Sequence, residues 1–159
     1  MQAQPIKITR ARLWQVNLPL RQPFRSSEGI VDCKPVVLLE LTGAAGRHGY
    51  GGGGAFLTPF YTAEFTAGTL AFLKGLALPR VVGSAYVSPA ALSEQFAGWQ
   101  GNQMALAALD EALWDLFAQA AGQPLATFLG SRRPAAAAGG SLGVPESPAA
   151  LVAQGEAGG

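Results

Sequence analysis

The sequence predicts an α+β fold in which a three-stranded antiparallel meander precedes a bundle of helices. Three observations lead to this prediction. Strand-like apolar patterns and glycine-rich turns occupy the first third of the chain. Apolar residues at helical spacing follow between residues 61 and 130, and beyond residue 133 the composition shifts to Ala, Gly and Ser. Strands followed by helices are typical of a sheet with helices packed on one side.

The N-terminal segment is predicted to form the strands. Residues 6–20 have strand character, with a change of phase near Arg10 that is consistent with a bulge. Residues 36–41 are a nearly continuous apolar strand, and a glycine-containing turn leads into a third strand at residues 47–51. Residues 24–29 are polar with one aromatic and one glycine, which predicts a loop after the first strand.

The next segment is predicted to be helical. A first helix begins at residue 61, has Glu64 near its positive N-terminal end, and stops at Pro79. A second, short helix begins with Ser88 as its N-cap and runs toward Trp99. The predicted buried face of the first helix consists of Phe65, Leu70, Leu73 and Leu76.

Residues 101–130 carry the clearest helical pattern. Asn102 is predicted to be the N-cap. Gly122 is predicted to stop the helix, and Pro124 opens a further helical turn. The predicted buried stripe contains Ala105, Leu106, Leu109, Leu113, Leu116, Phe117 and Ala120.

The other side of this helix is polar. Glu111 and Asp115 project opposite the stripe, and Trp114 lies on its flank, which predicts a second packing surface for another domain or subunit. Together with Asp110 they form an acidic group on one helix, whereas paired catalytic carboxylates flank a substrate from a cleft. We therefore interpret these carboxylates as a solvated face or as hydrogen-bonding groups at a domain contact.

The C-terminal segment is predicted to start a second domain. Residues 139–144 read as a short strand and Ser147 as the cap of a following helix, which together begin a parallel βα unit that the chain does not complete. The alternative for this Ala/Gly-rich segment is a flexible linker or a disordered end. The predicted domains are residues 1–133 and residues 134–159, the latter as the beginning of a truncated barrel.

Composition narrows the class of protein. The 159 residues allow one domain, or a small domain plus part of another. With 49% hydrophobic and 13% charged residues, the chain is too apolar for a disordered protein and too sparsely charged for a nucleic-acid-binding one. Cys33 is the one cysteine, which excludes an intrachain disulfide, and no apolar run has transmembrane length. We therefore expect a cytoplasmic protein with neither a nucleic-acid nor a membrane partner.

Few residues offer catalytic chemistry. His48 is the one histidine, so the chain has too few candidate residues for a His-containing catalytic triad or a His-based metal site. The glycine run at residues 51–54 lacks the Gly-Lys-Ser/Thr of a phosphate loop, which favours a flexible strand-end loop. Phe24, Phe56 and Tyr61 lie within or beside loops at strand ends, where specificity is often carried, although local hydrophobic anchoring explains them equally well.

Several motifs along the chain belong to one pattern. The helical segment contains Gly101-Asn102-x-Met104-Ala105, Ala108-x-x-x-Ala112-x-Trp114-Asp115-Leu116 and Gly122-x-Pro124-Leu125-x-x-x-Leu129-Gly130. These resemble the last helices of the N-terminal capping domain in the enolase superfamily. Further motifs are similar to the branch of N-acylamino acid racemases and o-succinylbenzoate synthases, namely Pro23-Phe24-Arg25-Ser26-Ser27, Gly49-Tyr50-Gly51, Pro59-x-Tyr61-x-x-Glu64 and, for the first barrel strand, Gly140-Ser141-Leu142-Gly143-Val144.

The resemblance implies a capping domain over a modified TIM barrel, in an enzyme that abstracts a proton α to a carboxylate. A divalent metal, usually Mg²⁺, stabilises the enediolate, and the outcomes include dehydration to o-succinylbenzoate and racemisation of N-acylated amino acids. Such enzymes take the base from a Lys-x-Lys motif and the metal ligands from three later acidic residues. Because the last lysine here is Lys74, we expect neither in this chain. Family members are commonly oligomeric, so the resemblance is compatible with a homo-oligomer, and it leaves the oligomeric state of this chain open.

The resemblance assigns substrate contacts but no catalytic residue or metal ligand to this chain. Two departures from the family pattern concern the same loops. Gly52 stands where the family usually has Glu in Gly-x-Gly-Glu, and Glu28 places a charge where an apolar residue is common. The substrate-binding residues implied by the resemblance are Phe24, Ser27, Phe56, Tyr61 and Ser141.

We therefore expect the capping-domain portion of such an enzyme. It would shape substrate specificity over a barrel supplied in cis or as a separate chain, and it would not be active alone. The alternative is a non-catalytic interaction module or a nonfunctional remnant. The surface around Trp114 distinguishes these two hypotheses. In a chain without a barrel, this surface would be exposed and would drive association.

Overall fold

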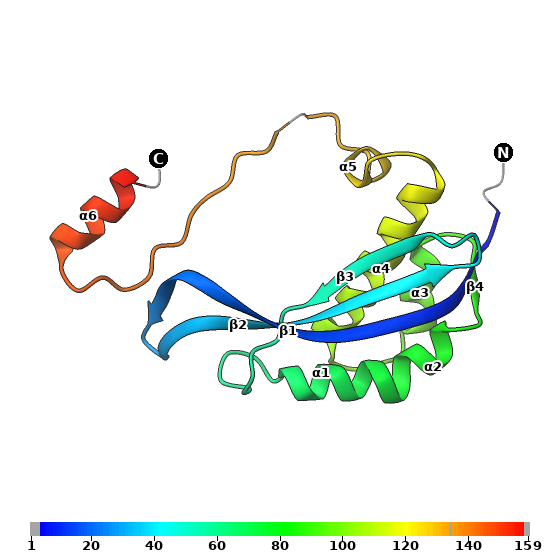
Figure 1. Cartoon of the computed structure of the whole chain (residues 1–159), viewed down its shortest axis with the longest axis horizontal. Coiled ribbons are helices and arrows are strands. Elements are labelled where there is room, and N and C mark those ends of the chain that lie inside the picture. Colours follow the sequence, from blue (N-terminus) through cyan, green and yellow to red (C-terminus); the bar gives the residue numbers. More distant parts are fainter. Residues whose placement is uncertain (1–3, 134, 158–159) are drawn as a thin grey trace. The chain divides into compact units, whose positions relative to one another are not determined.

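The computed structural model describes residues 4–133 and 135–157 (Figure 1). The chain falls into two compact units. The first consists of Met1–Val16 and Pro35–Ser131, and the second of Asn17–Lys34 and Arg132–Gly159.

The sheet contains four strands in the order β3-β2-β1-β4. β1 (Ile6–Ser26), β2 (Gly29–Gly43) and β3 (His48–Gly53) are neighbours in sequence order, which confirms the predicted meander. The prediction of three strands was incomplete, because β4 (Ala85–Tyr86) pairs antiparallel with the N-terminal end of β1. A two-residue strand is too short for hydrophobic alternation to reveal it.

A tight turn connects β1 and β2 in place of the loop predicted for residues 24–29. Only residues 27–28 lie outside the strands. The Glu28 amide donates a hydrogen bond of 3.2 Å to Ser26 Oγ. Gly29 follows with a φ of +139°, a conformation that favours glycine. The polar composition is therefore that of a hairpin turn at the end of long strands.

The core-facing side of β1 changes phase, as predicted. Ile8 is fully buried, whereas Ala11 and Leu13 are the next residues of β1 packed against the core. Because Ile8 and Ala11 are an odd number of residues apart, strict alternation would place them on opposite faces. A local change in the pleat therefore lies between them.

A helix with an irregular middle follows the sheet. α1 (Thr66–Phe72) passes into a π-helical turn, η1 (Leu73–Ala77), and then into α2 (Leu78–Val81). The predicted start at residue 61 and the predicted stop at Pro79 were both wrong. Pro79 lies in the first turn of α2, where its missing N–H disturbs little because the π turn already interrupts the regular i→i−4 bonding.

The buried face of this helix differs from the prediction. Phe65 and Leu76 are exposed, whereas Leu73 is fully buried and Leu70 is half-buried. The wider π turn changes which side chains face the sheet. The buried positions are Thr66, Thr69, Phe72, Leu73 and Ala77.

Three further helices complete the first unit: α3 (Ala90–Gln95), α4 (Gln103–Ala120) and α5 (Leu125–Phe128). The predicted stop at Gly122 is confirmed. This glycine has a φ of +66°, and the N–H groups of residues 122 and 123 bond back to the last turn of α4 at 3.1 and 3.0 Å. Within the described part of the chain, no helix combines the length and apolarity needed to cross a bilayer.

A residue distant in sequence provides the side-chain hydrogen bond at the N-terminus of α4. Asn102 occupies the predicted N-cap position, but it has a φ of 55° and its side chain makes no capping hydrogen bond. Instead, Glu64 Oε2 accepts a hydrogen bond of 2.9 Å from the Met104 N–H. Glu64 was predicted to stabilise the N-terminus of the helix after it, whereas its carboxylate neutralises the positive end of α4.

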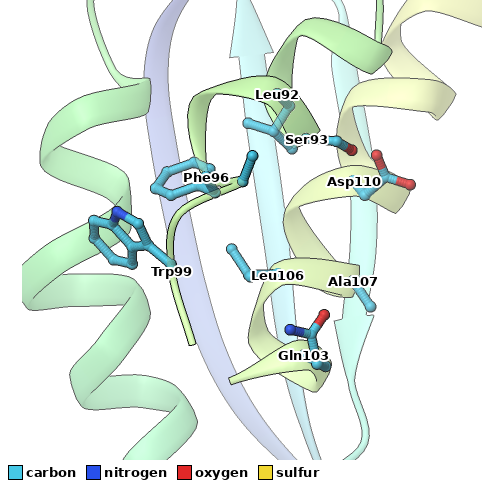
Figure 2. Close-up of a pocket in the computed structure, with 9 residues that line it drawn as sticks. Leu92, Ser93, Phe96, Trp99, Gln103, Leu106, Ala107 and Asp110 are labelled. Atoms are coloured by element: carbon cyan, nitrogen blue, oxygen red, sulfur yellow. The ribbon is translucent and has the colours of Figure 1, made fainter. Parts of the chain in front are cut away.

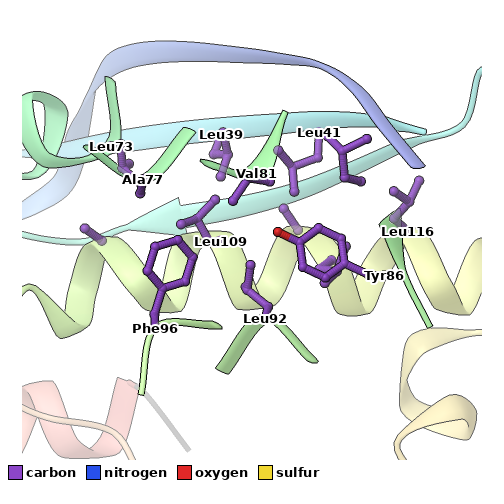
Figure 3. Close-up of a cluster of buried hydrophobic side chains, with 14 of the residues drawn as sticks. Leu39, Leu41, Leu73, Ala77, Val81, Tyr86, Leu92, Phe96, Leu109 and Leu116 are labelled. Atoms are coloured by element: carbon purple, nitrogen blue, oxygen red, sulfur yellow. The ribbon is translucent and has the colours of Figure 1, made fainter. Parts of the chain in front are cut away.

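The core lies between one face of the sheet and α4 (Figure 3). Val37, Leu39 and Leu41 alternate along β2 and are fully buried. Most of the predicted stripe of α4 is buried with them, although Leu106 is half-buried and Ala120 is exposed. The residues of α4 that are at most 5% exposed are Ala105, Ala108, Leu109, Ala112, Leu113, Leu116, Phe117 and Ala118.

The glycines of β3 allow α4 to approach the strand backbone. A Cβ at Gly49 would overlap the Ala112 carbonyl oxygen, and a Cβ at Gly51 would overlap that of Ala108. At Gly52, which points to the other face of the sheet, the nearest atom would be 3.8 Å away. The glycine run was predicted to be a flexible loop, but residues 51–53 form part of a strand packed under a helix.

The polar side of α4 binds the free edge of β3. Glu111 Oε2 accepts a hydrogen bond of 2.8 Å from the Gly52 amide, and Asp115 Oδ2 accepts one of 3.0 Å from the Tyr50 amide. Gln119 Nε2 donates one of 2.7 Å to the His48 carbonyl oxygen. We call these three hydrogen bonds the edge ladder. Its members are four residues apart on the helix and two residues apart on the strand, and both spacings correspond to roughly 6–7 Å. Glu111 and Asp115 therefore form hydrogen bonds at a packing contact, while Glu111 also remains exposed to solvent.

Trp114 packs within the chain. Its ring lies 5.7 Å from that of Phe128 in an edge-to-face arrangement, so α5 covers part of the surface that we had assigned to another domain or subunit. Trp114 is half-buried. The turn at Gly122 returns the chain along α4 and makes this contact.

The face of the sheet opposite α4 carries a polar group around Glu40, whose side chain is 6% exposed. Tyr50 donates a hydrogen bond of 3.1 Å from its hydroxyl to Glu40 Oε2. Arg12 and His48 place nitrogen atoms 3.6 and 3.5 Å from Glu40 Oε1. His48 Nδ1 also lies 3.2 Å from Thr42 Oγ1, so the one histidine of the chain has a structural setting.

The second unit contains α6 (Pro148–Ala157), whose predicted cap is confirmed because the Ala150 amide donates a hydrogen bond of 3.2 Å to Ser147 Oγ. The strand predicted at residues 139–144 was wrong, since this segment is irregular. A parallel barrel strand is stabilised by neighbours on both sides, and the described residues place no such neighbour beside it.

Replacing Gly51 with alanine is expected to lower the free energy of unfolding by about 1–3 kcal/mol, the usual range for overpacking. The added methyl group would collide with the Ala108 carbonyl of α4. Gly52→Ala is the matched control on the same strand, where the space is free. Denaturant unfolding followed by circular dichroism compares the two variants. Equal stability of both would contradict the close approach of α4.

Glu111→Ala is expected to lower the free energy of unfolding by about 1 kcal/mol, because it removes the side-chain acceptor of the Gly52 amide. Glu111→Gln keeps an acceptor at that position and should retain most of the stability. Urea unfolding of both variants measures the difference. A Glu111→Ala variant as stable as the unmodified chain would show that the edge ladder contributes nothing.

The pKa of Tyr50 is raised, chiefly because its hydroxyl donates a hydrogen bond to Glu40, with desolvation and the charge of Glu40 adding to the effect. Glu40→Gln removes the negative charge and is expected to move the Tyr50 titration to lower pH. Phenolate absorbance during an alkaline titration measures this shift, and Tyr50→Phe identifies the signal. An unchanged titration in Glu40→Gln would show that this pair does not set the pKa.

Candidate functional site

Two of the five predicted site residues line one cavity in the second unit. Phe24, near the end of β1, and Ser141, in the irregular segment before α6, both border a space of about 570 Å³. Phe24 is 40% exposed, so its ring presents an apolar surface to this space. Small-molecule sites commonly have volumes of roughly 300–1,000 Å³ and combine apolar walls with a few polar groups.

The cavity is held together by contacts between β1 and the segment before α6. The Val144 amide donates a hydrogen bond of 2.8 Å to the Arg25 carbonyl oxygen. Gly143 lies so close to the same backbone that a Cβ would stand 2.9 Å from that oxygen. The Arg25 guanidinium also lies 3.5 Å from Glu146, although both side chains are largely exposed and such pairs contribute little stability.

Arg25 is a residue of this cavity that was not among the predicted site residues. Arg25 lines the cavity together with Phe24 and Ser141, and its guanidinium pairs with Glu146, which lines the same cavity. Arg25 is part of the motif Pro23-Phe24-Arg25. A single arginine in a polar segment, however, forms no pattern with other residues from which a binding role can be predicted. An apolar wall with a hydroxyl and a paired guanidinium and carboxylate suits a ligand that has both an apolar part and polar groups.

Ser27 lies in the tight turn between β1 and β2. It is exposed, and the residues that line the cavity do not include it. The hairpin places Ser27 beyond the end of β1, whereas Phe24 is within the strand.

Phe56 and Tyr61 belong to the first unit, where they form an aromatic cluster with Phe60. The Phe56 ring lies 4.9 Å from that of Phe60 and 6.0 Å from that of Tyr61. Tyr61 is 73% exposed, so the cluster reaches the surface. Thr66 fixes the backbone of this cluster. The amide and the hydroxyl of Thr66 both donate hydrogen bonds to the Phe56 carbonyl oxygen, at 2.7 and 2.9 Å. Sequence reasoning missed Phe60, although it stands in the same short loop.

The described residues do not fit a divalent metal. No group of three His, Cys, Asp or Glu side chains among them is arranged to hold an ion. Glu111 and Asp115, two carboxylates one turn apart on α4, accept hydrogen bonds from amides of β3. Mg²⁺ favours near-octahedral oxygen ligation, which these two groups do not provide.

Comparison with known proteins places this fold in a family. Residues 8–130 match the family described as mandelate racemase / muconate lactonizing enzyme, N-terminal domain. The chain is 34% identical over 143 residues to the o-succinylbenzoate synthase of Listeria innocua, covering 90% of this chain and 38% of the synthase. It is 39% identical over 142 residues to the N-succinylamino acid racemase of Thermus thermophilus, covering 89% of this chain and 38% of the racemase.

Solved structures agree with this assignment. A crystal structure of an enolase superfamily member from Listeria innocua matches 96% of this chain and 41% of its own, with a TM-score of 0.89 and 32% identity. The dipeptide epimerase of Cytophaga hutchinsonii, solved with Mg and the dipeptide D-Ala-L-Val, matches 81% of this chain and 34% of its own, with a TM-score of 0.68 and 29% identity.

The chain thus spans about two fifths of the length of the relatives it matches. The match to the family model covers the sheet and the helices through α5. The chain therefore belongs to the mandelate racemase / muconate lactonizing enzyme family of the enolase superfamily, and residues 8–130 are its N-terminal domain.

Proposed function

We propose that this chain is the capping-domain portion of a divalent-metal-dependent enzyme that abstracts a proton α to a carboxylate. Its activity would be that of an o-succinylbenzoate synthase or an N-acylamino acid racemase. The observation that carries the proposal is the identity of 34% and 39% to a synthase and a racemase of that kind across nearly the whole chain. The role of the chain is to provide specificity, and it is not active alone.

The cavity of the second unit supports a role in substrate binding. Phe24 offers an aromatic wall to the apolar part of a substrate, and the oppositely charged pair of Arg25 and Glu146 also borders the cavity. Ser141 provides a hydroxyl that donates to or accepts from a polar group. Ser27 stands in the turn beyond this cavity, where a contact with substrate would depend on the longer protein.

The aromatic cluster of the first unit supports a second specificity element. Phe56 is fixed through its carbonyl by Thr66, and Tyr61 leaves most of its ring exposed. An aromatic cluster with a fixed backbone and an exposed ring suits contact with the apolar part of a substrate. Gly52 carries no side chain on the open sheet face, so the acidic residue typical of the family at this position makes no contribution here.

We assign the base and the metal to the remainder of a longer protein or to a separate barrel chain. The described residues do not form a metal site, so no step of the reaction is attributed to them. Relatives extend well beyond the matched portion, which accounts for only 38% of the synthase and of the racemase.

A chimera tests the proposal. This chain replaces the matched N-terminal portion of the Listeria innocua synthase, and the chimera is assayed with Mg²⁺ for dehydration to o-succinylbenzoate and for α-proton exchange of an N-succinylamino acid. We expect activity in the chimera and none in the isolated chain. Phe24→Ala and Tyr61→Ala in the chimera are expected to raise KM about tenfold, because each removes apolar substrate contact.

Val87→Ala is the matched control, since Val87 is 62% exposed and lies outside both specificity elements. Proton exchange by the purified 159-residue chain in Mg²⁺ would overturn the proposal. A folded chimera without activity would favour the alternative, a non-catalytic interaction module. KM values unchanged by Phe24→Ala and Tyr61→Ala would remove both residues from the substrate contacts.

A further inference from the structure

A second cavity lies in the first unit, between α3 and the first half of α4 (Figure 2). Its volume is about 390 Å³, within the range of small-ligand sites. Ser93 and Asp110 stand together at one end, Gln103 stands at the other, and Leu106 lies between them. None of the residues proposed to contact substrate borders this cavity, so the inference does not rest on the proposed function.

The apolar wall of this cavity is already packed. Phe96 and Leu92 are 4% and 2% exposed. The Trp99 ring stands edge-to-face against Phe96 at 5.0 Å and against Phe72 at 5.3 Å. The Arg80 guanidinium lies 5.0 Å from the centre of the Trp99 ring, which further fixes that side chain. A ligand would therefore meet a wall that needs little rearrangement.

Asp110 is the one charged residue that lines the cavity. The ion pairs formed by the described residues join other groups, and none includes Asp110. Desolvation raises the pKa of Asp110, Glu111 adds to the increase through its charge, and a hydrogen bond with Trp114 opposes it. No cation contributes to this balance. The carboxylate is thus held half-buried beside an apolar wall without a compensating charge.

We propose that this cavity binds a small organic cation, namely a primary ammonium carried on a compact apolar body. The ammonium pairs with the Asp110 carboxylate, and the body lies against Phe96, Trp99 and Leu106. Ser93 and Gln103 supply neutral hydrogen-bonding groups beside it.

Charge complementarity selects this class of ligand. An anion would be repelled by Asp110, since no cationic residue lines the cavity. An uncharged apolar molecule would remove the carboxylate further from water without giving it a partner, which is unfavourable. An ammonium satisfies the carboxylate, and its apolar body gains the contacts of the aromatic wall.

The test uses the full ¹⁵N-labelled chain and two probes of the same shape, benzylammonium and the neutral benzyl alcohol. Titration of each is followed by amide chemical shifts. We expect benzylammonium to perturb residues 92–99 and 103–110, and to bind about tenfold more tightly than benzyl alcohol, the difference expected for one charge-assisted pair. Asp110→Asn should remove this preference, and benzyl alcohol should bind the variant at least as tightly as the unmodified chain, because a neutral side chain costs less to cover.

Asp110→Asn keeps the shape of the side chain and an acceptor for Trp114, so it should remain folded. Asp32→Asn is the matched control, because Asp32 is an exposed carboxylate in the second unit. Ala107→Leu reduces the cavity and should weaken both probes, which supports the location independently of charge.

Three outcomes would overturn the proposal. Equal affinity for the two probes would show an apolar cavity without charge selection. Equal loss in Asp110→Asn and Asp32→Asn would show unspecific attraction to carboxylates. Perturbation of the isolated chain but not of the barrel chimera would show that a segment of the longer protein fills the cavity. Failure of the chimera to catalyse its reaction leaves the probe titration of the isolated chain unaffected, so the two proposals fail separately.

Discussion

Helix α4 lies directly on the backbone of the edge strand β3, and the rest of the first unit depends on this contact. Gly49 and Gly51 make it possible, because any Cβ at these positions would overlap carbonyl oxygens of the helix. Small residues on the helix, Ala108 and Ala112, complete the close approach and are fully buried. With the helix axis fixed in this way, its leucines fill the space over β2 and form the core (Figure 3).

The same contact solves the problem of an exposed sheet edge. A free edge presents unpaired amides that invite pairing with another chain. Glu111 and Asp115 accept hydrogen bonds from the amides of Gly52 and Tyr50. Carboxylates that would otherwise form a solvated helix face therefore bind the edge, and the negative charge beside it disfavours further strand addition. Glu64 provides the corresponding interaction for the N-terminus of α4, so three carboxylates stabilise backbone amides in this unit.

The residues that we propose to contact substrate take no part in this helix–strand contact. Phe24 and Ser141 border a cavity of the second unit, and Phe56 and Tyr61 form an exposed aromatic cluster in the first. These are the features on which the proposed role in substrate selection rests. The cavity beside Asp110 is different in character, because it combines a packed aromatic wall with one uncompensated carboxylate. We therefore propose two chemically distinct surfaces for small molecules in this chain.

The sequence by itself determined the meander of β1, β2 and β3, the stop of α4 at Gly122, and the family, because these depend on local periodicity, on glycine conformation and on motif spacing. Tertiary structure decided what the polar and small residues do. Periodicity ranks positions by burial, and it cannot show that Glu111 faces a strand edge or that Gly51 faces a helix. The strand predicted at residues 139–144 was wrong for the same reason, since a strand is stabilised by partners that lie elsewhere in the fold.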